Sequence, residues 1–213
     1  FIWDFCAKNN VSYRSYGEFV ADDFGTKPRL ESLKGHAAAF APYGLAVRDT
    51  VRFRQWKKDF DSLIAINAVP KFNSIRMGND HTEGMRAGSL TPYSHVADND
   101  LAVGMFVDHL SKSTIWKESV VFILEDDAQN GPDHVDAHRS PAYVVGPYVK
   151  RSFVDHTMYT TSGMLRTMEL ILGLPPMTQF DAAATPMWRS FTSQPDNSVF
   201  NHLPANINLN DRN

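Results

Sequence analysis

The sequence is short of several features that mark whole classes of protein. Its 213 residues include one cysteine, Cys6, so no disulfide can form within the chain. No apolar run approaches the ~20 residues that a membrane-spanning helix needs. The formal net charge is −3 and the basic residues are scattered, which argues against a nucleic-acid-binding surface. What remains is a chain of ordinary composition, long enough to fold as one domain with a core.

Several motifs of enzyme chemistry are also absent. The sequence has no glycine-rich nucleotide-binding loop and no Gly-x-Ser-x-Gly turn that would present a nucleophilic serine. Cys6 has no neighbours that would make it a catalytic thiolate. Function therefore has to be sought in acids and histidines.

Helical and strand-like patterns alternate along the chain. Helical spacing predicts helices over residues 1–8, 53–63, 98–110 (with Asp98 as N-cap) and 161–173 (with Thr161 or Ser162 as N-cap). Alternating or apolar runs predict strands over residues 11–17, 72–77, 120–124 and 142–149. This order predicts an α/β domain over residues 1–187 with a mostly parallel sheet covered on both faces, so that residues 120–124 form a buried strand. Residues 22–49 are expected to form a loop, and residues 188–213 a polar, extended or poorly ordered tail.

Acids and histidines follow two of the predicted strands. In α/β folds, ligands bind beyond the carboxyl ends of the strands, so these side chains are expected to share one edge. They are Asp80 and His81 after the second strand, Glu125, Asp126 and Asp127 after the third, and then Asp133, His134 and His138.

Crowded carboxylates point to a bound cation. They repel one another, and at least one pKa rises unless a cation neutralises them. Carboxylate and imidazole ligands suit several divalent ions, so zinc, manganese, magnesium and calcium are not distinguished. Such an ion polarises a phosphoryl oxygen and activates a nucleophile, while a nearby histidine can protonate a leaving group. Acids at residues 125–127 alone would equally suit a strand that simply leaves the core.

Three segments in order carry a resemblance to a known family. The segments are "NDHTEG" from Asn79, "EDDAQNGPDHVDAHRSP" from Glu125 and "TSGMLRTMELILGLPP" from Thr161. Together they resemble the phosphoesterase family of the alkaline phosphatase superfamily, which includes bacterial acid phosphatases and phospholipases C. The resemblance implies a three-layer α/β/α sandwich with metal at the strand ends, and hydrolysis of a small-molecule or lipid phosphate ester.

The resemblance also implies roles for individual residues. Asp126 and Asp127 correspond to metal ligands, and Asp80 and His138 are further ligand candidates. His81 and His134 would line the pocket near the scissile phosphate. Glu125 and Asp133 would support the ligands from behind.

One part of the family pattern is missing. Family members have a ligand-bearing motif and a Ser or Thr nucleophile upstream of the Asn-Asp-His motif, and neither is found here. The chain is therefore expected to be the C-terminal half of a catalytic domain, inactive by itself, with the upstream half of the same polypeptide as its partner. Some members carry an N-terminal β-propeller, and the family favours a periplasmic or secreted location. The alternatives are a degenerate domain that only binds metal or phosphate, and hydrolysis of another ester.

Overall fold

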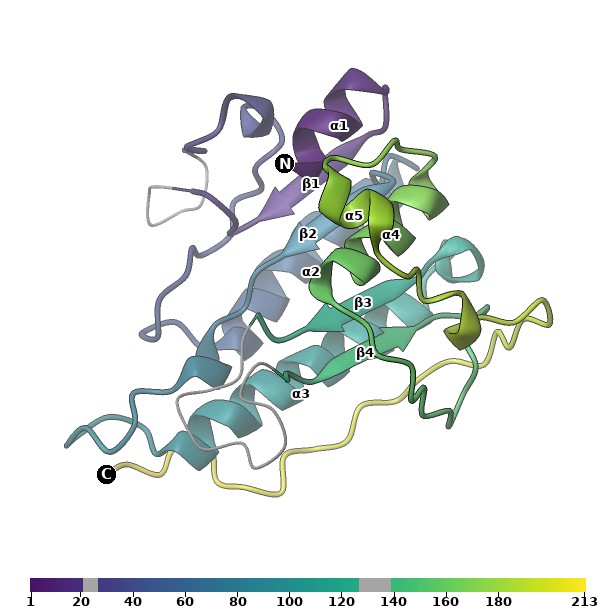
Figure 1. The fold of residues 1–213 in the computed structure, drawn as a ribbon. Coiled ribbons are helices and arrows are strands. Elements are labelled where there is room, and N and C mark those ends of the chain that lie inside the picture. The colour runs from purple at the N-terminus through teal and green to yellow at the C-terminus, as the bar shows by residue number, and fades with distance from the viewer. Residues whose placement is uncertain (21–26, 127–138) are drawn as a thin grey trace.

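The computed structural model describes residues 1–20, 27–126 and 139–213, which form an α/β fold (Figure 1). Within these residues the α-helices are α1 (Ile2–Lys8), α2 (Asp49–Ala65), α3 (Pro92–Ser111), α4 (Thr161–Leu172) and α5 (Gln179–Ala183). The strands are β1 (Tyr13–Tyr16), β2 (Phe72–Ile75), β3 (Val121–Leu124) and β4 (Ala142–Val145). None of the helices in this part of the chain has the length and apolar character needed to cross a membrane.

The strands form two small sheets rather than one mostly parallel sheet. β1 pairs with β2 in parallel, as expected, with Tyr13 opposite Phe72. β3 pairs with β4 in antiparallel orientation, with Val121 opposite Val145, and here the parallel expectation is wrong. A parallel pair needs a crossover across the sheet, usually a helix, and the sequence between β3 and β4 has no helical pattern.

Two hydrophobic clusters lie on opposite faces of β1. Tyr13 belongs to one cluster and Tyr16 to the other, because side chains alternate along a strand. The first cluster joins β1 to α1 and contains Ile2, Trp3, Cys6, Val11, Tyr13, Leu33 and Leu174. The second joins β1 to α2 and α3 and contains Tyr16, Ala38, Phe40, Phe53, Trp56, Phe60 and Phe106. The helical stripe of Phe and Trp in α2 is thus part of the core. Figure 1 shows α2 and α3 behind the strands and α4 and α5 in front of them.

The predicted start of α3 is wrong. The helix begins at Pro92, and the Thr91 hydroxyl accepts a hydrogen bond from the Ser94 amide as its N-cap. Asp98 lies inside the helix and is fully buried, with its carboxylate directed to the N-terminus of α2. In the sequence, a buried acid inside a helix cannot be told from an acid at the N-cap, because an apolar run follows both.

The boundaries of α4 are close to those predicted. Thr160, one residue before the expected cap, accepts a hydrogen bond from the Gly163 amide. Gly173 ends the helix with φ of 70°, a left-handed conformation that glycine adopts without strain.

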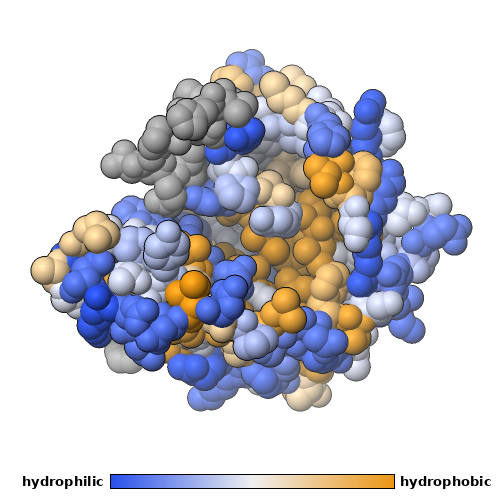
Figure 2. All heavy atoms as spheres, turned by 90° about the horizontal axis from the view of Figure 1, so that it is seen from below, coloured by the Kyte–Doolittle hydropathy of each residue, from blue (hydrophilic) through white to orange (hydrophobic). Residues whose placement is uncertain are grey.

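The sheet of β3 and β4 is more open than expected. The strand β3 was predicted to be buried, but Val121, Phe122 and Ile123 are half-buried and Leu124 is exposed. Neither hydrophobic cluster contains a residue of β3 or β4. Figure 2 shows apolar side chains gathered in a hollow on the face of the molecule seen from below. Tyr143 of β4 is exposed as well, so the described residues leave part of the apolar surface of this sheet uncovered.

Residues 188–213 begin with a short 3₁₀ turn at Trp188–Ser190 and end as an extended segment along α3 (Figure 1). The Ser94 hydroxyl donates to the carbonyl of Asn208 at 2.7 Å. Further along α3, Asp108 accepts hydrogen bonds from the amide and the ring of His202. The tail is extended, as expected, and polar contacts along α3 hold it in place.

The loop before α4 is expected to lose stability in acid. Burial alone would raise the pKa of Asp155, but hydrogen bonds from Thr157, Tyr159 and Ser190 outweigh burial and lower it to about 2. A carboxylate with a lowered pKa stabilises the fold above its ordinary value near 3.8, and this contribution is lost as the pH falls toward 2. Asp155→Asn should therefore lower the melting temperature at pH 7 and have little effect near pH 2, as measured by thermal unfolding.

The exposed Asp100 offers a matched control. Asp100→Asn should leave the melting temperature nearly unchanged at both pH values. An equal loss from Asp155→Asn at pH 7 and pH 2 would contradict the electrostatic account.

Candidate functional site

The turn of residues 78–81 connects β2 to the candidate site. After β2 ends at Ile75, the chain passes Gly78 and forms a short 3₁₀ turn at Asn79–His81. Gly78 lies against the ring of Tyr43, and a Cβ atom at this position would come within 2.9 Å of that ring. A side chain at this position would therefore have to displace the ring of Tyr43.

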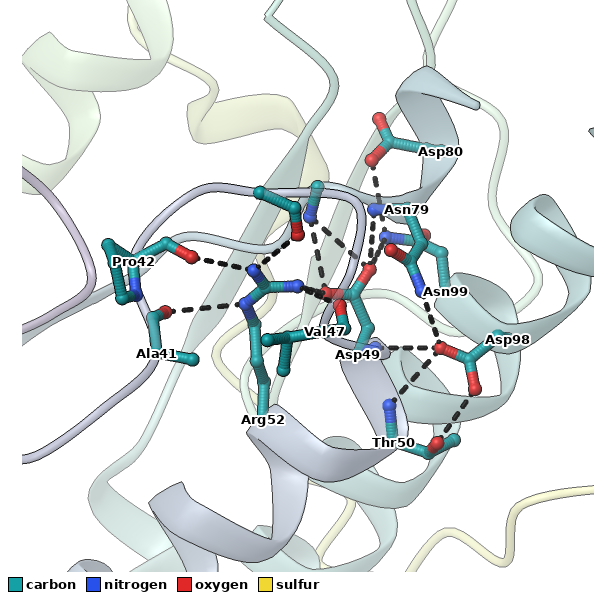
Figure 3. A network of polar contacts seen from close by, with 12 residues as sticks. Ala41, Pro42, Val47, Asp49, Thr50, Arg52, Asn79, Asp80, Asp98 and Asn99 are labelled. Atoms are coloured by element: carbon teal, nitrogen blue, oxygen red, sulfur yellow. Dashed lines mark hydrogen bonds and ion pairs between the residues drawn. The ribbon is translucent and has the colours of Figure 1, made fainter. Parts of the chain in front are cut away.

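A buried carboxylate holds this turn in place. Asp49, the first residue of α2, accepts hydrogen bonds from the backbone amides of Gly78 and Asn79 (Figure 3). It also forms an ion pair of 2.9 Å with Arg52, and both side chains are completely buried. Arg52 donates its remaining hydrogen bonds to the carbonyls of Ala41, Pro42, Gly44 and Val47. The buried charges are thus paired and fully bonded, as a buried ion pair requires.

A second buried carboxylate fastens α2 to α3. Asp98 of α3 accepts hydrogen bonds from the amides of Asp49 and Thr50 and from the Thr50 hydroxyl. It therefore caps α2 from a neighbouring helix, in place of a cap from the residue before α2. Asp98 also accepts a hydrogen bond from the side-chain amide of Asn79 at 2.9 Å.

Asp80 lies at the outer side of this network. Asn99 donates from one amide nitrogen to Asp49 at 3.0 Å and to Asp80 at 3.4 Å (Figure 3). Burial raises the pKa of Asp80, and the negative charges of Asp49 and Asp126 raise it further. Hydrogen bonds from backbone amides lower the pKa but do not cancel this rise. Asp80 therefore lies within reach of the negative charge of Asp126.

The shared metal site of Asp80 and Asp126 stays a prediction from the sequence. Asp80 follows β2 and Asp126 follows β3, which belong to two different sheets. Asp126 is exposed, and Glu125 beside it is half-buried. The amide of Glu125 donates to the carbonyl of Pro141, which continues the β3–β4 ladder by one residue.

His81 is exposed next to Asp80. Its ring meets the ring of Tyr43 edge to face, with 6.1 Å between centroids. Its Nδ1 atom lies 3.1 Å from the carbonyl of Thr82, so the Nε2 atom is the one free to meet a ligand. The ring is therefore held at one side and accessible at the other.

The other predicted site residues lie outside the described residues. They are Asp127, Asp133, His134 and His138. Their assignment as ligands, proton donors or supports stays a prediction from the sequence.

Sequence reasoning missed the residues that support the turn. Asp49, Arg52 and Asn99 were not singled out, and Asp98 was taken for a cap of its own helix. The one available signal was an acid followed by an arginine three residues later at the start of an amphipathic helix, which usually marks an exposed pair. The loop of residues 41–47, the turn at residues 78–79 and the neighbouring α3 together bury it.

Chemically, the arrangement suits a cation. Within residues 1–20, 27–126 and 139–213 no three His, Cys, Asp or Glu side chains gather in a metal-binding group. The described part of the site is Asp80, whose pKa burial and the nearby charges of Asp49 and Asp126 raise, and a cation is one way to relieve such crowding of negative charge.

Comparison of the chain with the models of known protein families gave no match, and comparison with curated protein sequences gave none either.

The support beneath Asp80 can be tested through Asp49. Asp49→Asn leaves Arg52 buried without a counter-charge, so it should lower the free energy of unfolding by about 3 to 5 kcal/mol in chemical denaturation. It should also speed hydrogen exchange at the amides of Gly78 and Asn79, which lose a charged acceptor.

Asp61 on the same helix is a suitable control, because its ion pair with Lys57 is partly exposed. Asp61→Asn should cost about 1 kcal/mol or less and leave exchange in the turn unchanged. Unchanged exchange at Gly78 and Asn79 in Asp49→Asn would show that Asp49 does not hold the turn.

Proposed function

We propose that the chain belongs to a metal-dependent hydrolase of phosphate esters. The observation that carries the proposal is the buried network that holds the turn of Asp80 and His81, where burial and the charges of Asp49 and Asp126 raise the pKa of Asp80. The resemblance of the segments around Asn79, Glu125 and Thr161 to phosphoesterases of the alkaline phosphatase superfamily supports the same reaction. Asp80 and Asp126, with Asp127 and His138 from the sequence, would hold the divalent cation.

A bound cation in such a site neutralises charge on the phosphoryl oxygens and favours ionisation of a hydroxyl nucleophile. His81, exposed beside Asp80, is suited to donate a proton to the departing alkoxide, and His134 is the second candidate. The buried network under the turn fixes the backbone of Asp80 and His81, so that both side chains begin from a defined position.

The open sheet supports a further part of the proposal. The half-buried strand β3 and the apolar hollow in Figure 2 fit a three-layer sandwich that is completed by other strands of the same polypeptide. Those strands would bring the Ser or Thr nucleophile that the family pattern requires upstream of Asn79. The chain described here would then supply metal ligands and a proton donor, without turnover of its own.

Metal binding by the chain itself is the first test. Titration with Mn²⁺, followed by isothermal calorimetry, should show binding that Asp80→Asn and Asp126→Asn each weaken by about tenfold or more. Asp100→Asn removes the same charge from an exposed position on α3 and should leave the affinity unchanged. Equal affinities for all three variants would contradict the site.

Turnover is the second test, made on the polypeptide that includes the upstream segment. After treatment with chelator, added divalent metal should restore hydrolysis of p-nitrophenyl phosphate or its bis ester, and Asp126→Asn or Asp127→Asn should remove most of it. Wild-type rates in both variants would refute the assignment. Metal-dependent turnover by residues 1–213 alone would show that the nucleophile is not upstream.

A further inference from the structure

A pocket of about 410 Å³ lies next to the candidate site but is not lined by Asp80 or Asp126. Four segments line it: residues 45–48 before α2, residues 83–90 after the turn of residues 78–81, His95 in the first turns of α3, and Arg212 in the tail. The lining residues that matter here are Arg48, Glu83, Arg86, His95 and Arg212.

The charge of this pocket is positive. Three guanidinium groups and one carboxylate line it, which gives a net charge of +2 (three minus one). Arg86 pairs with Glu83 at 2.9 Å. Arg48 and Arg212 instead donate to the neutral oxygens of Asn210 and Gly88. Two of the three cations thus have neutral partners in their hydrogen bonds, in a chain whose overall charge is −3.

A buried imidazole lines the same pocket without a partner. His95 is 1% exposed, and neither of its ring nitrogens has a hydrogen-bond partner among the described residues. The nearest acidic oxygen, on Glu83, lies 3.8 Å from Nε2, beyond hydrogen-bonding distance. Buried polar groups nearly always have a partner, and an oxygen atom of a ligand in the pocket would supply one.

We propose that this pocket binds the phosphate group of a small phosphorylated molecule. Guanidinium groups match the oxygens of phosphate in geometry and charge, and an imidazole N–H adds a further donor. The pocket is larger than a phosphate ion, and Leu45, Ala46 and Leu90 give it an apolar wall for a short organic group. The site is distinct from the carboxylate pair, which would repel an anion unless metal were bound.

The test is calorimetric titration of the chain with inorganic phosphate and with glycerol 3-phosphate, in the presence of EDTA. Arg86→Gln and Arg212→Gln should each weaken binding by about tenfold, because each removes a charge-assisted hydrogen bond. His95→Leu should weaken binding as well. Glycerol 3-phosphate should bind at least as tightly as inorganic phosphate, because its phosphate group makes the same charge-assisted hydrogen bonds.

Two controls make the result specific. Arg54→Gln removes an exposed arginine of α2 outside the pocket and should leave phosphate affinity unchanged. Asp80→Asn should not weaken it, which separates this site from the proposed metal site. The proposal is overturned if neither ligand binds, or if Arg54→Gln weakens binding as much as Arg212→Gln does. Either result would leave the proposed hydrolase function untouched, since that function is judged by metal binding and turnover.

Discussion

The buried ion pair of Asp49 and Arg52 is the interaction on which the candidate site depends. Its two charges lie 2.9 Å apart with no exposure to solvent, so each must be satisfied from within the protein. Arg52 is satisfied by carbonyls of residues 41–47, and Asp49 by amides of Gly78 and Asn79. One ion pair therefore joins a long loop, the start of α2 and the turn that carries Asp80 (Figure 3).

This arrangement places unlike charges on one short stretch of chain. Within residues 78–90, Asp80 faces other acids, whereas Glu83 and Arg86 face a pocket rich in arginine. An acidic site suited to a cation and a basic pocket suited to an anion thus share one loop. A phosphorylated ligand and a divalent metal are the two partners that such a loop could serve side by side.

The strands β3 and β4 are packed less closely than β1 and β2. β3 carries the most apolar strand sequence, yet it lies outside both hydrophobic clusters and pairs with one strand among the described residues. The carboxyl end of β3 nevertheless presents Asp126 near Asp80. The turn that carries Asp80 is held by α2 and α3, whereas Asp126 follows β3 in the antiparallel pair.

The positions of most helices and strands follow from the sequence, because hydrophobic spacing and helix-ending residues act locally. The stripe of Phe53, Trp56 and Phe60 in α2 and the end of α4 at Gly173 are where the pattern predicts them. It also places Asp80 and Asp126 directly after strands, as the structure has them. The tertiary structure alone shows that β3 and β4 are antiparallel, that Asp98 caps α2 rather than α3, and that the ring nitrogens of His95 have no hydrogen-bond partner among the described residues. These features depend on contacts between segments that lie far apart in the sequence. A local sequence pattern does not show which of these segments pack together.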